Sequence, residues 1–473
     1  MESGQTGSAR VRLGRGWAST SGVVGWSFTV AVLATTAYLA LEQYGVNLSV
    51  AVLGILSLIY GATIFLLHGG GRCTVLGLYN LAQALFVGYT GLVLPGSAIL
   101  EVPIGYLHSA VYWSLLCVTF VNSVAWRLSA PVYEGVGPPA LARHHRQAII
   151  GAGSVLYLGA SLAKALGLIP AISYLGEGFA FVGIVAVAAG LVFSPNFRVL
   201  SFSTVVIGAL FASYTLYNHS GTGRLRIVAL GCSLLLLWSL ARPALQTKFA
   251  VIAVSPLAVW ALASIRLAYQ ESLSPGSSDG RTGLESMLSP LATLAHTIAA
   301  VESGWETRSG LSYLTIISAP LPERWQPVWM PPALGYDLVA LVSPERVGTE
   351  FSVAVTSFGE GVWNFGMAGF FIASVVAVLI VSVSDRLIIW CTELVRNGSL
   401  RGSFYLVLAL IVGGTVGDFA WNGVHTFGTR IGTRLPAVVV LSVLVLFFLV
   451  FFRSVTRESK FINAPISTDG RSV

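Results

Sequence analysis

Long apolar runs separated by short polar connections dominate this chain. A run of about 20 apolar residues can cross a bilayer as a helix, and about twelve such runs occur. They cover residues 22–42, 47–67, 74–94, 105–126, 147–168, 174–194, 199–217, 226–241, 248–268, 362–384, 403–421 and 435–452. No small-residue cleavage site follows a short apolar core, so we expect a retained anchor and no signal peptide. The pattern predicts an all-α polytopic membrane protein.

One long polar segment, residues 266–358, interrupts these runs. We therefore expect five parts: an N-terminal tail (1–16), spans one to nine (17–267), a large loop (268–360), spans ten to twelve (361–453) and a C-terminal tail (454–473). Apolar residues at helical spacing in 283–302 predict one or two helices on the membrane surface, with Pro290 at a first turn or a break. Prolines from Pro320 onward predict an extended or turned stretch over 305–336.

Basic residues in the short connections set the expected orientation. Arg10, Arg12 and Arg15 precede the first span, which places the N-terminus inside the cell, and the even-numbered connections are also basic. The C-terminus then lies inside and the large loop outside. The net charge of +7 is thus a topological signal and does not indicate nucleic acid as a partner.

Composition supports the same class. The chain is 55% hydrophobic and 10% charged, whereas soluble domains are about 25% charged, and its mean hydropathy is +0.78. Its four cysteines are scattered without the spacing of metal ligands, so neither a disulfide framework nor a metal site is expected.

Charged residues at membrane edges are costly and are candidates for function. Glu360 stands before span ten, where it could deprotonate a hydroxyl or cap a helix N-terminus. Asp418 opens a dense polar group with His425, Arg430 and Arg434. Capping of the last helical turn explains Asp418 alone but not the whole group.

Two further sets of residues have two interpretations each. Arg224 and Arg226 follow a glycine-rich turn and form either an anion site or lipid-facing anchors. The loop aromatics are either interfacial anchors or platforms for sugar rings; they are Trp305, Trp325, Trp329 and Tyr336. Lys164 and Glu177 lie at the ends of consecutive spans, which predicts a structural salt bridge.

Three motifs follow one another along the chain. They are residues 223–226 (GRLR), 321–327 (LPERWQP) and 359–369 (GEGVWNFGMAG). In this order the segment resembles the O-antigen and capsular polysaccharide repeat-unit polymerases (Wzy-type), which are membrane glycosyltransferases of GT-C-like, all-helical architecture. Val362–Trp363 stands where a tyrosine is usual in the third motif, and Gln326 precedes Pro327 in the second.

The resemblance implies metal- and cofactor-independent polymerisation of undecaprenyl-diphosphate-linked repeat units at the outer face of the plasma membrane. It further implies a flippase and a chain-length regulator as partners. Glu360, Asp418 and His425 are the catalytic candidates on this interpretation. The diphosphate would bind Arg224, Arg226, Arg308 and Arg324, and the sugars Trp325, Trp329 and Asn364.

Two other functions remain open. About twelve spans with both ends inside also suit a transporter or lipid-linked sugar flippase, although the connection at 194–198 is short for the central inner loop of a major-facilitator protein. An O-antigen-type ligase shares the long outer loop and its arginines. Transferases of the dolichol-phosphosugar type need acidic pairs in a first outer loop, which here spans only residues 42–46.

Overall fold

A computed structural model describes residues 20–96, 102–129, 141–167, 173–194, 197–219, 224–273, 285–318, 327, 329, 334–348 and 352–462. These residues are helical or lie in short connections, and no strand occurs among them. The expected all-α class is therefore confirmed for this part of the chain.

The N-terminal part of the described chain contains ten α-helices and two π-helical segments, besides two short 3-10 helices. They are α1 (Thr20–Leu41), α2 (Val46–Leu67), α3 (Val75–Gln83), η2 (Ala84–Tyr89), α4 (Thr90–Val93), α5 (Ile104–Ser129), α6 (Arg143–Ala165), α7 (Ser173–Val192), α8 (Phe197–Ser213), η5 (Tyr214–Asn218), α9 (Leu225–Ala241) and α10 (Leu245–Leu273).

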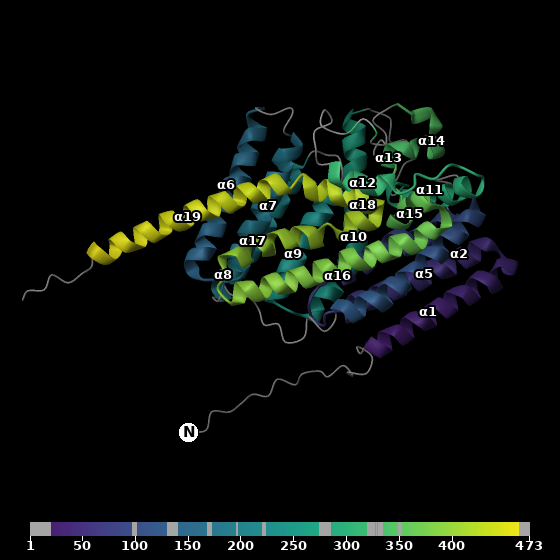
Figure 1. Cartoon of the computed structure of the whole chain (residues 1–473), viewed down its shortest axis with the longest axis horizontal. Coiled ribbons are helices and arrows are strands. Elements are labelled where there is room, and N and C mark those ends of the chain that lie inside the picture. Colours follow the sequence, from purple (N-terminus) through teal and green to yellow (C-terminus); the bar gives the residue numbers. More distant parts are fainter. Residues whose placement is uncertain are drawn as a thin grey trace, which may run out of the picture.

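Nine further α-helices follow in the rest of the described chain. They are α11 (Glu285–Glu302), α12 (Leu311–Ser318), α13 (Leu334–Asp337), α14 (Val339–Val342), α15 (Ser357–Phe365), α16 (Gly369–Arg396), α17 (Leu400–Gly414), α18 (Val416–Gly432) and α19 (Leu435–Ile462). Helices α11 to α15 gather near the Gly369 end of α16, on one side of the bundle (Figure 1).

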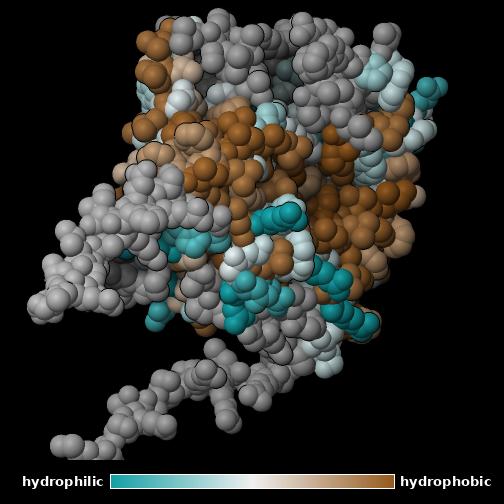
Figure 2. All heavy atoms as spheres, turned by 60° about the vertical axis from the view of Figure 1, so that its left-hand side comes forward, coloured by the Kyte–Doolittle hydropathy of each residue, from teal (hydrophilic) through white to brown (hydrophobic). Residues whose placement is uncertain are grey.

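Eight helical segments within the described chain are long and apolar enough to cross a membrane. They are Thr20–Tyr44, Val46–Leu67, Val75–Val93, Ile104–Ser129, Arg143–Ala165, Leu245–Ile265, Ser357–Arg396 and Val416–Phe451. Three shorter apolar helices accompany them: Gly176–Val192, Leu225–Ala241 and Leu400–Gly414. Figure 2 shows a broad band of hydrophobic residues across the molecule, with hydrophilic residues gathered mainly below it in this view. The chain is a multi-pass membrane protein.

The boundaries around the large loop differ from expectation. Helix α10 continues to Leu273, so the expected boundary at 267/268 falls inside a helix. Span ten does not start at residue 362 as one straight helix: α15 begins at Ser357, ends at Phe365 and is followed by a turn through Gly366, whose φ is 61°. Only then does α16 begin, at Gly369.

Two loop predictions need correction. Residues 285–302 form a single helix, α11, but its apolar side chains are buried against α5 and α15, so it packs within the protein and does not lie on the membrane surface. Residues 311–318 form the helix α12, although the prolines predicted extended chain. Those prolines begin only at Pro320, after α12 has ended.

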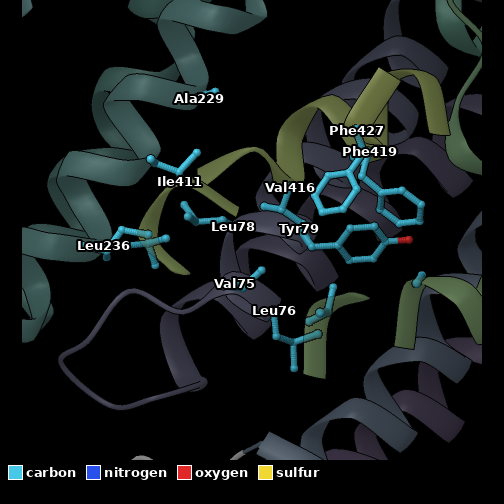
Figure 3. Packing of buried hydrophobic residues seen from close by; sticks show 14 of the residues in the cluster. Val75, Leu76, Leu78, Tyr79, Ala229, Leu236, Ile411, Val416, Phe419 and Phe427 are labelled. Carbon is cyan, nitrogen blue, oxygen red and sulfur yellow. The ribbon is translucent and has the colours of Figure 1, made fainter. Parts of the chain in front are cut away.

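The core near the centre of the bundle joins helices far apart in sequence. Side chains of α3, α9, α17 and α18 meet there (Figure 3). The ring of Tyr79 stacks on Phe419 at 6.0 Å, and Phe419 meets Phe427 edge-on at 6.0 Å. This packing anchors α18, whose shape organises the candidate site.

Candidate functional site

Helix α18 is folded back on itself at Asn422 and Gly423. Their φ angles are −149° and 73°, which break the helix. Nη1 of Arg434 donates to Oγ1 of Thr415 over 2.6 Å, although the two residues are 19 positions apart. That many residues of straight helix would span ~28 Å. The two arms, 416–421 and 424–432, are therefore joined at the bend, and their far ends lie close together.

The apex of α18 faces the 359–369 motif. This motif forms a tight helix–turn–helix, because Gly361 and Gly369 let α15 and α16 approach closely: a Cβ added to Gly369 would lie 1.9 Å from the Gly361 carbonyl oxygen. Thr356 caps α15, its hydroxyl accepting from the Gly359 amide over 3.2 Å. The motif thus presents one face of α15 to α18.

Glu360 joins the two elements. Its carboxylate is fully buried and accepts hydrogen bonds from the backbone amides of Val424 and His425, the latter over 3.4 Å. These amides are the first of the second arm of α18, and the first amides of a helix have no partner within it. Glu360 therefore caps this arm, where the helix dipole favours a negative charge.

Ser312 and Asn364 complete the environment of Glu360. The Ser312 hydroxyl donates to Oε1 of Glu360 over 2.8 Å, and Nδ2 of Asn364 donates to Oγ of Ser312 over 2.6 Å. The Asn364 amide also donates to the Glu360 carbonyl, and its oxygen accepts from the Ser312 amide. Asn364 was a predicted sugar ligand, but its buried amide is occupied in holding α12 against α15.

Arg308, a predicted diphosphate ligand, lies on the other side of α15. Its Nε and Nη2 donate to the two oxygens of Asp337 over 2.8 and 2.5 Å, and Nε1 of Trp363 donates to Asp337 over 2.9 Å. The hydrogen bonds to Asp337 raise the pKa of Arg308 above its usual value. This two-pronged pair ties the α13 turn to the motif and neutralises Arg308.

A second cluster of charges lies between the ends of α7, η5 and α9. Glu177 pairs with Nη1 of Arg226 and with Nδ1 of His219, the latter at 3.2 Å. It also accepts from the Tyr214 hydroxyl over 3.1 Å. Arg226 was a predicted diphosphate ligand, and Glu177 orients its guanidinium.

The open end of α18 adds two arginines to this cluster. Gly178 on α7 packs against Thr433, where a Cβ would lie 2.9 Å from the carbonyl oxygen. The guanidinium of Arg434 lies 3.9 Å above the ring of Phe181 and is within electrostatic reach of Arg226 and Arg430. The guanidinium groups of Arg226, Arg430 and Arg434 therefore lie near one another, where the ends of α7, α9 and α18 meet.

Asp418 faces these arginines. Its side chain is buried and lies 3.9 Å from Nη1 of Arg430, beyond hydrogen-bonding distance. Within the described ranges, neither Asp418 oxygen nor that Arg430 nitrogen has a hydrogen-bond partner. Buried polar groups are nearly always hydrogen-bonded, so Asp418 and Arg430 are exceptions among the buried side chains of the described residues.

The predicted salt bridge between Lys164 and Glu177 is wrong. Lys164 instead donates to the backbone carbonyls of Tyr217 and His219. The π-helical segment η5 brings these carbonyls to the end of α6, while Glu177 turns to Arg226.

The structure separates the predicted catalytic trio. The backbone of His425 touches Glu360, whereas Asp418 belongs to the arginine cluster at the other end of α18. Arg224 lies two positions before Arg226, at the N-terminal end of α9, and donates to the Leu262 carbonyl over 3.3 Å. Trp329 is 62% exposed. Arg324 and Trp325 lie outside the described residues.

Ser312, Asp337 and Tyr214 were not among the predicted site residues, and Arg430 and Arg434 were not among the predicted diphosphate ligands. The dipeptide Asn422–Gly423, a typical turn signal inside an apolar run, was the available hint that α18 bends. No protein-family model, no curated protein and no solved structure matches this chain.

Proposed function

We propose that this protein is a membrane glycosyltransferase that polymerises undecaprenyl-diphosphate-linked repeat units at the extracytoplasmic face of the plasma membrane. The observation that carries the proposal is the convergence of Arg226, Arg430 and Arg434 on two carboxylates between apolar helices. Three guanidinium groups against two carboxylates leave the cluster with an excess positive charge. Such a cluster fits an anion attached to a lipid.

The reaction needs its leaving group stabilised. An acceptor hydroxyl attacks the anomeric carbon of the donor, a glycosidic C–O bond forms, and the bond from that carbon to the diphosphate oxygen breaks. Negative charge then grows on the undecaprenyl diphosphate. Arginine suits this task because its planar guanidinium donates two parallel hydrogen bonds to phosphate oxygens, and fixed cations in a buried site stabilise developing charge strongly.

The hydroxyl proton must also be accepted. Asp418 is the carboxylate best placed to do so, because its oxygens have no hydrogen-bond partners among the described residues and it lies beside Arg430. Glu360 has a different part: its three hydrogen bonds hold the second arm of α18, and that arm carries Arg430. Glu360 is thus a positioning residue.

Purified protein in lipid nanodiscs would test the proposal. The substrate is the lipid-linked repeat unit extracted from cells that lack this gene, so its sugars need not be known in advance. We expect a ladder of lipid-linked chains from the wild type, and no ladder when Arg226, Arg430 and Arg434 are all replaced by alanine. Arg346→Ala, a loop arginine beside Glu345, is the control and should leave the ladder intact.

Other outcomes would overturn the proposal. A transporter would move the lipid-linked unit across the bilayer without lengthening it. A ligase would transfer chains to a different acceptor and would leave single units unpolymerised. A normal ladder from the triple alanine variant would show that the arginine cluster is not needed for the reaction.

A further inference from the structure

Three buried polar side chains meet between α3 and α15. They are Tyr79 and Gln83, one turn apart on α3, and Ser357, the first residue of α15. None of the three is more than 1% exposed. The Tyr79 hydroxyl lies within interaction distance of both the Gln83 amide and the Ser357 hydroxyl. These side chains therefore form one buried polar group inside the bundle.

The polar atoms of this group have no hydrogen-bond partner among the described residues. They are Oη of Tyr79, Oε1 and Nε2 of Gln83, and Oγ of Ser357. A side-chain amide can make four hydrogen bonds and a hydroxyl three. Burying such atoms without any partner is destabilising, and nearly all buried polar atoms in proteins have one. We therefore expect the buried polar group to bind a ligand.

The surroundings of the group restrict the kind of ligand. The ring of Tyr79 stacks on Phe419, and Phe358, which follows Ser357, is fully buried. A sugar or another large molecule would need an opening to the surface, and these side chains are buried. None of the three is charged, so an ion would lack compensation. Water both donates and accepts, and a buried water typically makes about three hydrogen bonds.

The backbone beside the group is irregular. Helix α3 changes into the π-helical segment η2 at Ala84, directly after Gln83. Interruptions of this kind are frequent at functional sites, and water can insert into helical hydrogen bonding where a helix is distorted. The irregular backbone and the unpartnered polar atoms therefore occur at the same place in the chain.

We propose that Tyr79, Gln83 and Ser357 bind buried water, which bridges α3 and the start of α15. The bound water donates to and accepts from all three side chains. Because Ser357 lies three positions before Glu360, the water holds the helix that carries Glu360 against α3. It is thus a structural ligand of α15, and its site lies outside the arginine cluster.

X-ray hydroxyl-radical footprinting of the full-length protein in nanodiscs would detect the water. Radiolysis of a bound water oxidises the side chain next to it, so a buried tyrosine is labelled where water is bound. We expect mass spectrometry to find oxidised Tyr79. Tyr60 is the matched control, because it is also buried but bonds the Ser27 hydroxyl over 2.6 Å and should stay unlabelled. Absence of label on Tyr79, or equal labelling of the two tyrosines, would overturn the proposal.

Gln83→Met adds a measurement whose sign is informative. If water bonds the amide, the variant should unfold at a temperature lower by about 2 °C or more and should lose the label on Tyr79. If the amide bonds nothing, its removal should raise the unfolding temperature, because two buried atoms without partners are gone. Gln147→Met, at an exposed position of α6, is the control and should change neither quantity.

Direct hydrogen bonds among the three side chains are the competing arrangement. Gln83→Met would then also lower the unfolding temperature, but Tyr79 of the wild type would stay unlabelled, and the proposal would be rejected. If Gln83→Met fails to fold, the wild-type comparison of Tyr79 with Tyr60 still decides. Rejection of the water site would leave the proposed function as it stands, because no arginine of the cluster belongs to the buried polar group.

Discussion

The carboxylate of Glu360 caps the second arm of α18 at Val424, across 64 positions of sequence. The contact links the 359–369 motif to the helix arm that carries Arg430. Because Glu360 is fully buried and bonded to Ser312, Val424 and His425, its main effect is on the geometry of α18.

Replacing Glu360 tests whether it holds structure or performs chemistry. Glu360→Gln should lower stability by about 1–3 kcal/mol, since an amide cannot accept all the hydrogen bonds of a buried carboxylate. Thermal unfolding in detergent would measure the loss. Glu302→Gln, at an exposed position, is the control and should change little. A variant that unfolds like the wild type but makes no polymer would instead identify Glu360 as the base.

The bend of α18 depends on Gly423. Its φ of 73° disfavours other residues, and a Cβ there would lie 1.9 Å from Oε2 of Glu360. Gly423→Ala should therefore destabilise the protein by about 2 kcal/mol or more, from backbone strain together with the displaced carboxylate. Gly417→Ala on the same helix has open space and should be neutral or stabilise by up to about 1 kcal/mol. Equal unfolding temperatures for the two variants would contradict this account.

We expect Arg308 to stabilise the fold through its pair with Asp337 and not to bind the substrate. Arg308→Ala should cost about 1 kcal/mol or less, because the Arg308 side chain is 40% exposed and solvent screens the pair. Asp337→Ala should cost about 1–3 kcal/mol, because it also leaves Nε1 of the buried Trp363 without its acceptor. The double variant should lose less than the sum of the two, which a double-mutant cycle of unfolding would measure. Polymerisation by the double variant should match that of folded wild type. Loss of elongation in Arg308→Ala alone would favour the diphosphate role predicted from sequence.

Asp418 is the expected proton acceptor. Asp418→Asn should slow elongation about 100-fold or more, the usual contribution of a general base. Binding of labelled polyprenyl diphosphate should not weaken, because a negative charge leaves the arginine cluster. A single-turnover assay and a binding titration would separate the two effects.

Asp385→Asn provides the matched control for this prediction. Asp385 is also fully buried, but it accepts from the amides of Val75 and Leu76, over 2.7 and 3.2 Å. Its replacement should lower the unfolding temperature and leave elongation per folded molecule unchanged. Similar losses of elongation rate in both variants would indicate that the role of Asp418 is structural and that it is not the proton acceptor.

The sequence by itself determined the class of this protein. Apolar runs of membrane-spanning length are a local property, so an all-helical, multi-pass chain follows from them whatever the packing. Part of the site was also visible, because Asp418, Arg430 and Arg434 lie close along the chain. The positions of Glu360 and Arg226 marked them as costly charges.

Only the tertiary structure decided which of these groups meet. Hydrophobic periodicity does not report a bend such as that at Gly423, nor partners 64 positions apart. Glu177 pairs with Arg226 and not with Lys164, and Arg308 pairs with Asp337. These pairings depend on how the helices pack and on which buried groups then need hydrogen bonds. The folding back of α18 sends Asp418 to the arginines and His425 to Glu360, because His425 lies next to the bend at Gly423 whereas Asp418 lies near the far end of the first arm.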